Sequence, residues 1–251
     1  MRMSPWAPAA LIREHVGLDT VLHFPTRGRN LLRLQGDLLA AHALGIRNLF
    51  ITLGDPARIG DYPAATDNVD VVSTGLLELV TGSLNKGRDK MGEPIGEPTS
   101  FVCGCAVDLG SADVDHECKL MLKKIASGAV FALSQPVYSA DMLRTFKKAY
   151  EERHGPLTLP ILVGLQPLVT SRHAERLHNE VPGITIPDHV RDRMRGASDE
   201  RDEGVAIAVE LGRELRADAA GIYLVTPFGR YGLAAEVVEA IKDGLNHHGS
   251  V

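Results

Sequence analysis

Short apolar runs alternate with amphipathic stretches along the whole chain. Each run is rich in β-branched and aromatic residues and is nearly continuously apolar, as expected for a strand that is buried on both faces. We therefore predict six strands, at residues 20–24, 48–53, 101–107, 129–134, 159–165 and 221–225. Regular alternation of such strands with helices indicates parallel strands joined by right-handed crossovers.

The stretches between the runs carry apolar residues at helical spacing. Asn30 precedes one of them and is suited to be its N-cap, and Asp113 is suited to cap another, which ends at Gly128. We predict helices at residues 8–16, 31–41, 71–81, 113–124, 140–153, 171–180, 203–216 and 233–245, and a short extra helix within 187–197.

The second and third strands are separated by an unusually long segment, residues 54–100. It holds one helix and a Gly/Pro-rich tail, residues 82–98. Long surface loops are often functional, although a tolerated insertion would have the same pattern.

A closed barrel of alternating strands and helices needs eight strands, whereas six are predicted here and the first element is a helix. We therefore expect an α/β fold of the (βα)8 TIM-barrel type, incomplete, with about six parallel strands. The length of 251 residues suits a single domain over residues 1–251. An open sheet would expose two parallel edges, which favours a homo-oligomer over a monomer.

Charge and cysteine content exclude several kinds of partner. The net charge is −5 without a basic cluster, which argues against nucleic acid. The three cysteines, Cys103, Cys105 and Cys118, form no C-x-x-C pair, so we expect small buried side chains in a reducing cytoplasm rather than disulfides or metal ligands. No run of about 18 apolar residues occurs and the start lacks the apolar core of a signal peptide, so we expect no membrane partner.

Polar side chains follow each predicted strand, where parallel sheets bind ligands. In strand order they are His23 with Thr26 and Arg27, Gly54-Asp55, Asp108 with Asp113, Ser134-Gln135-Pro136, Gln166 with Thr170, and Thr226 to Arg230. G-x-S-x-G, H-E-x-x-H and P-loop motifs are absent, so the set suits recognition of a flat, nitrogen-rich ligand more than hydrolysis. Each residue alone has an ordinary alternative: Asp55 can begin a turn, His23 can be a core histidine and Arg230 a surface charge.

Four motifs occur in a specific order along the chain. They are Gly45-Ile46-Arg47-Asn48, Leu53-Gly54-Asp55-Pro56, Lys123-Lys124-Ile125 with Gly128-Ala129, and Ser134-Gln135-Pro136. In this order they resemble the methylenetetrahydrofolate reductase family. The resemblance is closest to the reductase half of bifunctional homocysteine S-methyltransferase/5,10-methylenetetrahydrofolate reductase proteins. That half has segments similar to residues 2–6, 23–30, 92–99 and 227–230.

The resemblance implies an eight-stranded βα barrel that holds FAD. It also implies the family's reaction, in which NAD(P)H reduces the flavin and the flavin then reduces 5,10-methylenetetrahydrofolate to 5-methyltetrahydrofolate. By matching position, Gly54 and Asp55 would contact the cofactor. Asp55 would lie beside the flavin and the folate, where its negative charge would disfavour the anionic reduced flavin and make it a better hydride donor. His23 matches a flavin-contacting histidine, and Val72 and Ser73 match a pair that flanks the flavin.

The resemblance places three further cofactor contacts on one helix, at Glu117, Lys123 and Lys124, near the phosphate and ribose groups. Gln135 matches a glutamine that hydrogen-bonds the pterin, so we expect it, with Asp55, to be catalytic. The residues expected to bind substrate are Gln135, Gln166 and Arg230. No metal ligands are expected.

The sequence departs from the family in three ways. We expect the family's first strand, first helix and second strand (its first βαβ unit) to lack a counterpart in this chain, and with them the glutamate general acid of that first strand. The methyltransferase half of the bifunctional proteins is also without a counterpart. Ser171 stands where many members have an aromatic residue that covers the substrate. We therefore expect impaired reductase activity in the chain as given.

Two alternatives stay open. One is a non-catalytic flavin- or folate-binding relative, or a barrel completed by a partner chain. The other is a lyase or aldolase on the same barrel. Such enzymes place a Schiff-base lysine or metal carboxylates at strand ends, whereas Lys123 and Lys124 fall on a predicted helix.

Overall fold

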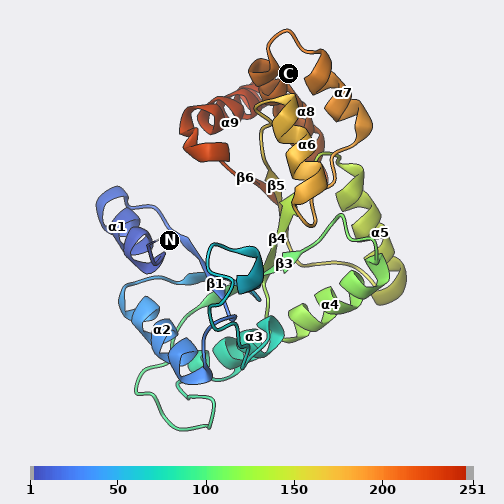
Figure 1. Ribbon diagram of the computed structural model, residues 1–251. Helices are drawn as coiled ribbons and strands as arrows, with labels where there is room; N and C mark the ends of the chain where they lie inside the picture. Colours follow the sequence, from blue (N-terminus) through green and yellow to red (C-terminus); the bar gives the residue numbers. More distant parts are fainter. Residues whose placement is uncertain (1–2, 247–251) are drawn as a thin grey trace. The chain divides into compact units, whose positions relative to one another are not determined.

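The computed structural model describes residues 3–246 and places six parallel strands in one sheet, in the order β1-β2-β3-β4-β5-β6 (Figure 1). The strands are β1 (Val21–Pro25), β2 (Asn48–Thr52), β3 (Val102–Val107), β4 (Phe131–Pro136), β5 (Ile161–Leu165) and β6 (Gly221–Leu224). Neighbours in the sheet are also neighbours in the sequence, so each connection joins adjacent parallel strands. The predicted α/β fold with six parallel strands is confirmed.

Helices connect the strands. The helices of the described residues are α1 (Trp6–Val16), α2 (Leu31–Ala43), α3 (Ser73–Gly82), α4 (Val114–Ala126), α5 (Asp141–His154), α6 (Ser171–Glu180), α7 (Asp188–Gly196), α8 (Glu200–Leu215) and α9 (Tyr231–Asn246). Short 3-10 turns occur at η1 (Ala57–Ile59), η2 (Leu84–Lys86) and η3 (Pro227–Gly229). Two predicted caps are confirmed: Asn30 accepts from Arg33 N at 2.8 Å, and Asp113 accepts from His116 N at 2.9 Å.

The fourth strand begins two residues later than predicted. Ala129 N donates to Lys124 O and so belongs to the connection after α4, whereas Val130 N already donates to Cys103 O of β3, one residue before β4 begins. The prediction of a strand at 129–134 is therefore misplaced. As a consequence Gln135 lies inside β4 rather than after it, with an exposed side chain.

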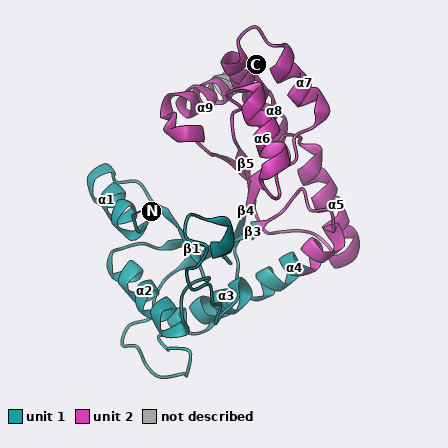
Figure 2. Cartoon of the chain, in the orientation of Figure 1, with its two compact units in different colours: residues 1–106, 120–132 teal, residues 107–119, 133–251 magenta. Residues whose placement is uncertain are grey.

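The chain divides into two compact units (Figure 2). Unit 1 comprises residues 1–106 and 120–132, and unit 2 comprises residues 107–119 and 133–251. The single domain over residues 1–251 stays a prediction.

The core of unit 1 lies on one face of β1 and β2. Leu22 pairs in register with Leu49 and Phe24 with Ile51, and all four side chains are buried. The indole ring of Trp6 in α1 packs edge-on against Phe24, 5.6 Å between centroids. The opposite face of β1 is exposed, so the expectation that every strand is buried on both faces is wrong for β1. Successive side chains of a strand point to opposite faces, and in β1 the face that carries Val21 and His23 stays exposed.

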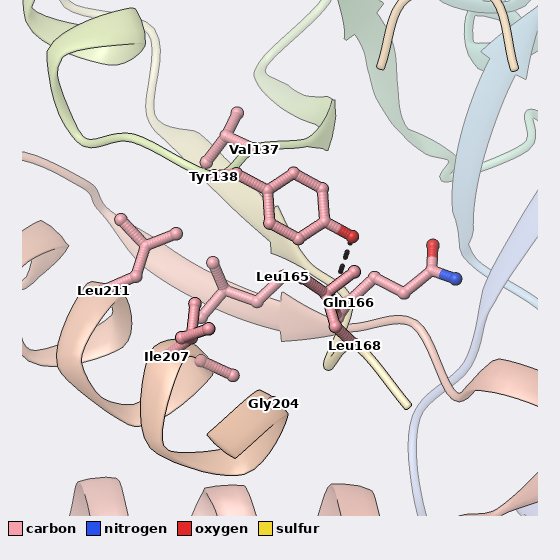
Figure 3. A pocket seen from close by; sticks show the side chains of 9 residues that line it. Val137, Tyr138, Leu165, Gln166, Leu168, Gly204, Ile207 and Leu211 are labelled. Carbon is pink, nitrogen blue, oxygen red and sulfur yellow. Dashed lines mark hydrogen bonds between the residues drawn. The ribbon is translucent and has the colours of Figure 1, made fainter. Parts of the chain in front are cut away.

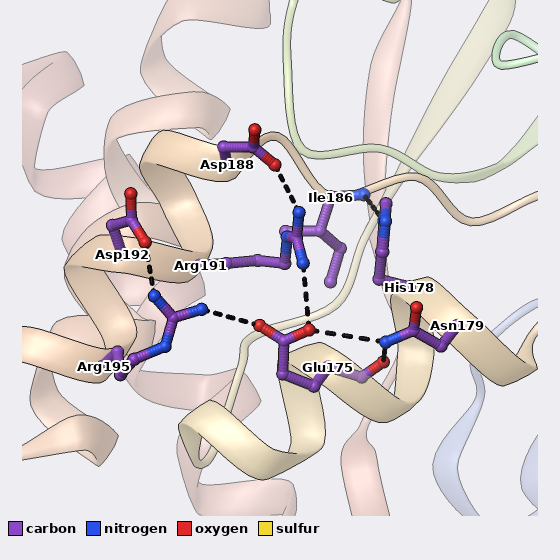
Figure 4. Close-up of polar contacts among 8 residues, drawn as sticks. All are labelled: Glu175, His178, Asn179, Ile186, Asp188, Arg191, Asp192 and Arg195. Atoms are coloured by element: carbon purple, nitrogen blue, oxygen red, sulfur yellow. Dashed lines mark hydrogen bonds and ion pairs between the residues drawn. The ribbon is translucent and has the colours of Figure 1, made fainter.

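Unit 2 has an apolar core between α6, α7 and α8, which includes Leu168, Ile186 and Met194. The extra helix predicted within 187–197 is α7. Glu175 of α6 links α6 to α7: its carboxylate accepts hydrogen bonds from Arg191 Nη1 at 2.9 Å and from Arg195 Nη2 at 3.0 Å (Figure 4).

The three cysteines are free and buried, as expected for small apolar side chains. Burial raises the pKa of the Cys103 thiol to about 12. Among the residues that the structure describes, no helix is both long and apolar enough to cross a membrane.

Candidate ligand sites at the strand ends

The turn that carries Asp55 follows β2 and depends on a glycine. Gly54 has φ +86°, and a Cβ on it would lie 2.9 Å from Cβ of Pro25. A side chain at this position would meet both backbone strain and a neighbouring strand. Asp55 itself is exposed, and its carboxylate has no hydrogen bond or ion pair within residues 3–246. The turn therefore presents a carboxylate with its acceptor capacity unused.

Arg27 braces this turn from the end of β1. Its backbone N donates to Leu53 O at 2.9 Å, and its Nε donates to Gly54 O at 3.0 Å. Its Nη1 lies 3.4 Å from Asp67 Oδ2, which also accepts from Ala57 N at 3.0 Å. The backbone on both sides of Asp55 is thus held by one ion pair.

The face of β1, β2 and β3 that carries His23 is lined by aromatic rings and is open only in part, since Phe50 is 8% exposed. His23, Phe50 and Gly104 occupy one row across the three strands. The imidazole of His23 lies 4.7 Å from the Phe50 ring, and a Cβ on Gly104 would lie 2.2 Å from Cε2 of Phe131. Gly104 therefore leaves room for the Phe131 ring on the same face. Burial lowers the pKa of His23, which favours a neutral imidazole at pH 7.

Apolar side chains border this row and are left open to solvent. Val21 and Val102 share the adjacent row and are 44% and 42% exposed. Elsewhere in unit 1, Val72 is 54% exposed and precedes Ser73 at the start of α3. Exposed apolar surface beside aromatic rings suits a flat aromatic ligand.

The three predicted contacts on α4 differ in their surroundings. Lys123 is exposed. Lys124 is buried and its Nζ donates to Ala106 O at 2.7 Å, near the end of β3. Glu117 is also buried, and its Oε1 accepts from Asp108 N at 3.3 Å. Lys124 and Glu117 therefore also hold the backbone at the end of β3.

Unit 2 has its own group of polar side chains. Gln135 in β4 is exposed, and its Cγ would lie 3.6 Å from a Cβ on Gly183. The Cβ position of Gly183 also lies 3.7 Å from Asp108 Oδ2. Gln135 and the Asp108 carboxylate thus both lie next to Gly183.

Gln166 lies after β5 between two cavities. A small apolar cavity on one side is closed by side chains of α8, and the Tyr138 hydroxyl donates to Gln166 O at 3.1 Å there (Figure 3). The amide of Gln166 points away from these apolar side chains (Figure 3). On the other side Gln166 lines an open pocket of about 300 Å³. The other lining residues include His173, Arg176, Thr226 and Phe228.

Phe228 lines this pocket in a strained conformation. With φ +52° it is the one non-glycine residue of positive φ among residues 3–246, although its ring is 69% exposed. Its ring centroid lies 5.2 Å from that of His173. Burial, followed by the charges of Arg176 and Arg230, lowers the pKa of His173. The pocket thus combines a neutral imidazole, an aromatic ring, a guanidinium and an amide.

The structure separates the predicted residues into two sets. Unit 1 holds those predicted to contact the cofactor: His23, Gly54, Asp55, Val72, Ser73, Lys123 and Lys124. Unit 2 holds Glu117 and those predicted to contact substrate: Gln135, Gln166 and Arg230.

Three residues of these sites carried no assigned role in the sequence: Asp67, His173 and Phe228. Asp67 lies in the long segment after β2 and His173 lies inside α6. Phe228 belongs to the strand-end segment 226–230 but carried no role of its own. Within the described part of the chain, no group of three His, Cys, Asp or Glu side chains is arranged to hold a metal ion.

The parallel sheet with its alternating helices defines an α/β protein of the TIM-barrel type. In that class of fold, active sites are formed at the carboxyl ends of the strands. Comparison of the sequence with known families gives the more specific assignment. The chain belongs to the methylenetetrahydrofolate reductase family, whose profile matches residues 3–239.

Two curated relatives carry the same name. Methylenetetrahydrofolate reductase 1 of Schizosaccharomyces pombe is 24% identical over 210 residues, which cover 82% of this chain and 32% of that protein. The probable methylenetetrahydrofolate reductase (NADPH) of Caenorhabditis elegans is 25% identical over 244 residues, 93% of this chain and 34% of that protein. The chain thus spans about a third of the length of these relatives.

Solved structures share the fold. An uncharacterized protein from Clostridium thermocellum that binds two copies of 5-methyl-5,6,7,8-tetrahydrofolic acid superposes with a TM-score of 0.63 at 12% identity, over 94% of this chain and 78% of that chain. DmoA from Hyphomicrobium sulfonivorans gives a TM-score of 0.55 at 11% identity, over 96% of this chain and 72% of that chain. At such identities the similarity shows the fold alone.

Proposed function

We propose that this chain carries the reductase chemistry of its family, the reduction of 5,10-methylenetetrahydrofolate to 5-methyltetrahydrofolate by NAD(P)H through bound FAD. The observation that carries the proposal is Asp55, an exposed carboxylate held on a braced turn after β2, in a chain whose family match covers residues 3–239. When bound, FAD would supply hydride transfer in two half-reactions, one with each substrate.

The residues of unit 1 fit a flat aromatic cofactor. His23, Phe50 and Phe131 provide rings on one face of the sheet, and Val21 and Val102 extend that face with exposed apolar surface. Gly54 lets the chain turn closely past Pro25, so backbone rather than a side chain faces the end of β1. The Asp55 carboxylate would repel negative charge that develops on a neighbouring ligand, which favours hydride release from a reduced ring system.

The residues of unit 2 fit a folate. A folate joins a polar pterin to an aryl amide and a carboxylate tail. The Gln135 amide can donate and accept hydrogen bonds at a pterin edge. The pocket beside Gln166 offers the Phe228 ring for aromatic contact, and the guanidinium of Arg176 for a carboxylate. The Clostridium protein of similar fold binds a methyltetrahydrofolate, which supports this choice of ligand.

The test begins with the absorbance spectrum of the purified protein, with and without added FAD. We expect flavin bands, bleaching of these bands by NADH or NADPH without oxygen, and their return on addition of 5,10-methylenetetrahydrofolate. Asp55→Asn should keep the flavin and slow its reoxidation by folate. Asp19→Asn, which changes another exposed carboxylate of unit 1, is the matched control and should react like the wild type.

A second candidate is a relative that binds folate without reducing it. It is favoured by the Clostridium protein of similar fold, which is described by its binding of 5-methyl-5,6,7,8-tetrahydrofolic acid and not by a reaction. The same experiments separate the two. Protein that binds 5-methyltetrahydrofolate but takes up no flavin would support the second candidate. Protein that binds neither flavin nor folate would contradict both.

A further inference from the structure

The Asp55-Pro56 dipeptide lies between two backbone anchors that share one ion pair. On its amino side Gly54 O accepts from Arg27 Nε at 3.0 Å. On its carboxyl side Ala57 N donates to Asp67 Oδ2 at 3.0 Å. Arg27 Nη1 and Asp67 Oδ2 are 3.4 Å apart, which links the two anchors. The side chains of Arg27 and Asp67 are 20% and 29% exposed, so water screens their pairing only in part.

The segment that carries Asp67 is itself fixed to the chain that follows β1. Gly28 N donates to Asn68 O at 2.9 Å, and Arg29 forms a parallel bridge with Val69. Asp70 Oδ2 then accepts from Leu31 N at 3.0 Å. Asp67 is therefore presented by a segment attached to the end of β1. The backbone of Arg27 is fixed at the same end of β1, because its N donates to Leu53 O.

From this arrangement we propose that Arg27 and Asp67 are positioning residues that set the place of the Asp55 carboxylate. Neither needs to touch a ligand. The inference rests on the proposed function, because it concerns the role of Asp55 in flavin-dependent reduction. Its physical basis is the planar guanidinium, which donates from Nε and Nη1 in fixed directions toward Gly54 O and Asp67. Lysine has one nitrogen and cannot reproduce this fork.

The first experiment measures the anchors without any ligand. Hydrogen exchange at the Ala57 amide should speed up in Asp67→Asn and in Arg27→Gln, since each variant removes one side of the ion pair. The control is Arg33→Gln, which breaks the 2.7 Å contact with Asp37 in the same unit but touches neither anchor. Unchanged exchange in both test variants would overturn the inference.

The second experiment measures anaerobic reoxidation of the reduced protein by 5,10-methylenetetrahydrofolate. A displacement of about 1 Å at a reacting group can cost about 100-fold in rate, so we expect Arg27→Gln to slow the step by about 10- to 100-fold. Arg27→Lys should recover only part of this rate, and Arg33→Gln should lose none. Flavin content should stay unchanged in all three variants.

The decisive comparison adds Asp55→Asn. If Arg27 acts through Asp55, Arg27→Gln has little further effect in the Asp55→Asn background. A general loss of folding would instead multiply the two effects, and that result would overturn the inference. A wild-type protein that takes up no flavin, or that is not reoxidised, would overturn the proposed function and the catalytic part of the inference, while the exchange data would still report the anchors.

Discussion

Phe228 allows the strain at the unit 2 pocket to be measured separately from ligand binding. We compare Phe228→Gly with Phe228→Ala. At ordinary positions within helices and strands, alanine is more stable than glycine by about 0.5–1 kcal/mol. At φ +52° the order should reverse, because a residue with a Cβ costs about 1–2 kcal/mol in the left-handed region.

The magnitude follows from the exposure of the ring. Phe228 is 69% exposed, so about a third of the 1.5–3 kcal/mol for burying a phenylalanine side chain is at stake, about 0.5–1 kcal/mol. Both variants lose this amount, and it cancels between them. What remains is the strain that glycine relieves, less its larger unfolded-state entropy. We therefore expect Phe228→Gly to be more stable than Phe228→Ala by about 1 kcal/mol.

Urea denaturation followed by circular dichroism measures this difference. A gap of about 1 kcal/mol corresponds to about 2–4 °C in melting temperature for a chain of this size. Both variants lose the ring and should raise the KM for folate to a similar extent, about three- to tenfold. Tyr231→Ala, which removes another exposed aromatic ring, should leave the KM unchanged. An alanine variant as stable as the glycine variant would refute the assignment of strain to Phe228.

Two further predictions concern other parts of the structure. Gly54→Ala should destabilise the protein by about 2 kcal/mol or more, because residue 54 has φ +86° and the new Cβ would clash with Pro25. Gly36→Ala in α2 should instead stabilise the protein by about 0.5–1 kcal/mol, because a Cβ there would lie in open space. Thermal unfolding compares the two variants, and equal effects would contradict the geometry. The folded state holds the pKa of His173 below the ordinary value of about 6.5, so unfolded chains take up the proton first and stability should fall as pH drops below about 6.5. His173→Asn should flatten this fall in urea titrations between about pH 7 and pH 5, and an unchanged slope would argue against a neutral imidazole at this position.

Much of the fold could be predicted because its signals are local. The caps at Asn30 and Asp113 follow from side chains that hydrogen-bond the backbone within three residues. The strands follow from apolar runs whose length suits β-structure. The strand starts are less accurate: β4 and β5 each begin two residues later than their apolar runs, and before β4 Ala129 belongs to the turn at Gly128, which has φ +101°. An apolar run alone does not show where hydrogen bonding between strands begins.

The candidate sites could be predicted in part. The positions of Asp55, Gln135 and Gln166 after or near strand ends, and their order along the chain, were visible in the sequence. The contacts that these side chains and their neighbours make could not be predicted. Lys124 looks like a charge available to a ligand, yet its Nζ is buried against Ala106 O. Helical spacing does not show which of two adjacent lysines turns inward.

The sequence by itself determined the order of elements, the α/β class and the family, because periodicity, capping and motif order are properties of neighbouring residues. Only the tertiary structure decided how Arg27 and Asp67, 40 residues apart, bracket Asp55. It also decided that Phe228, whose backbone has a positive φ, places its ring next to His173. These contacts depend on the register of parallel strands and on the course of the loops between them. Parallel strands are joined by long crossovers, so such partners are distant in sequence and leave no local pattern to read.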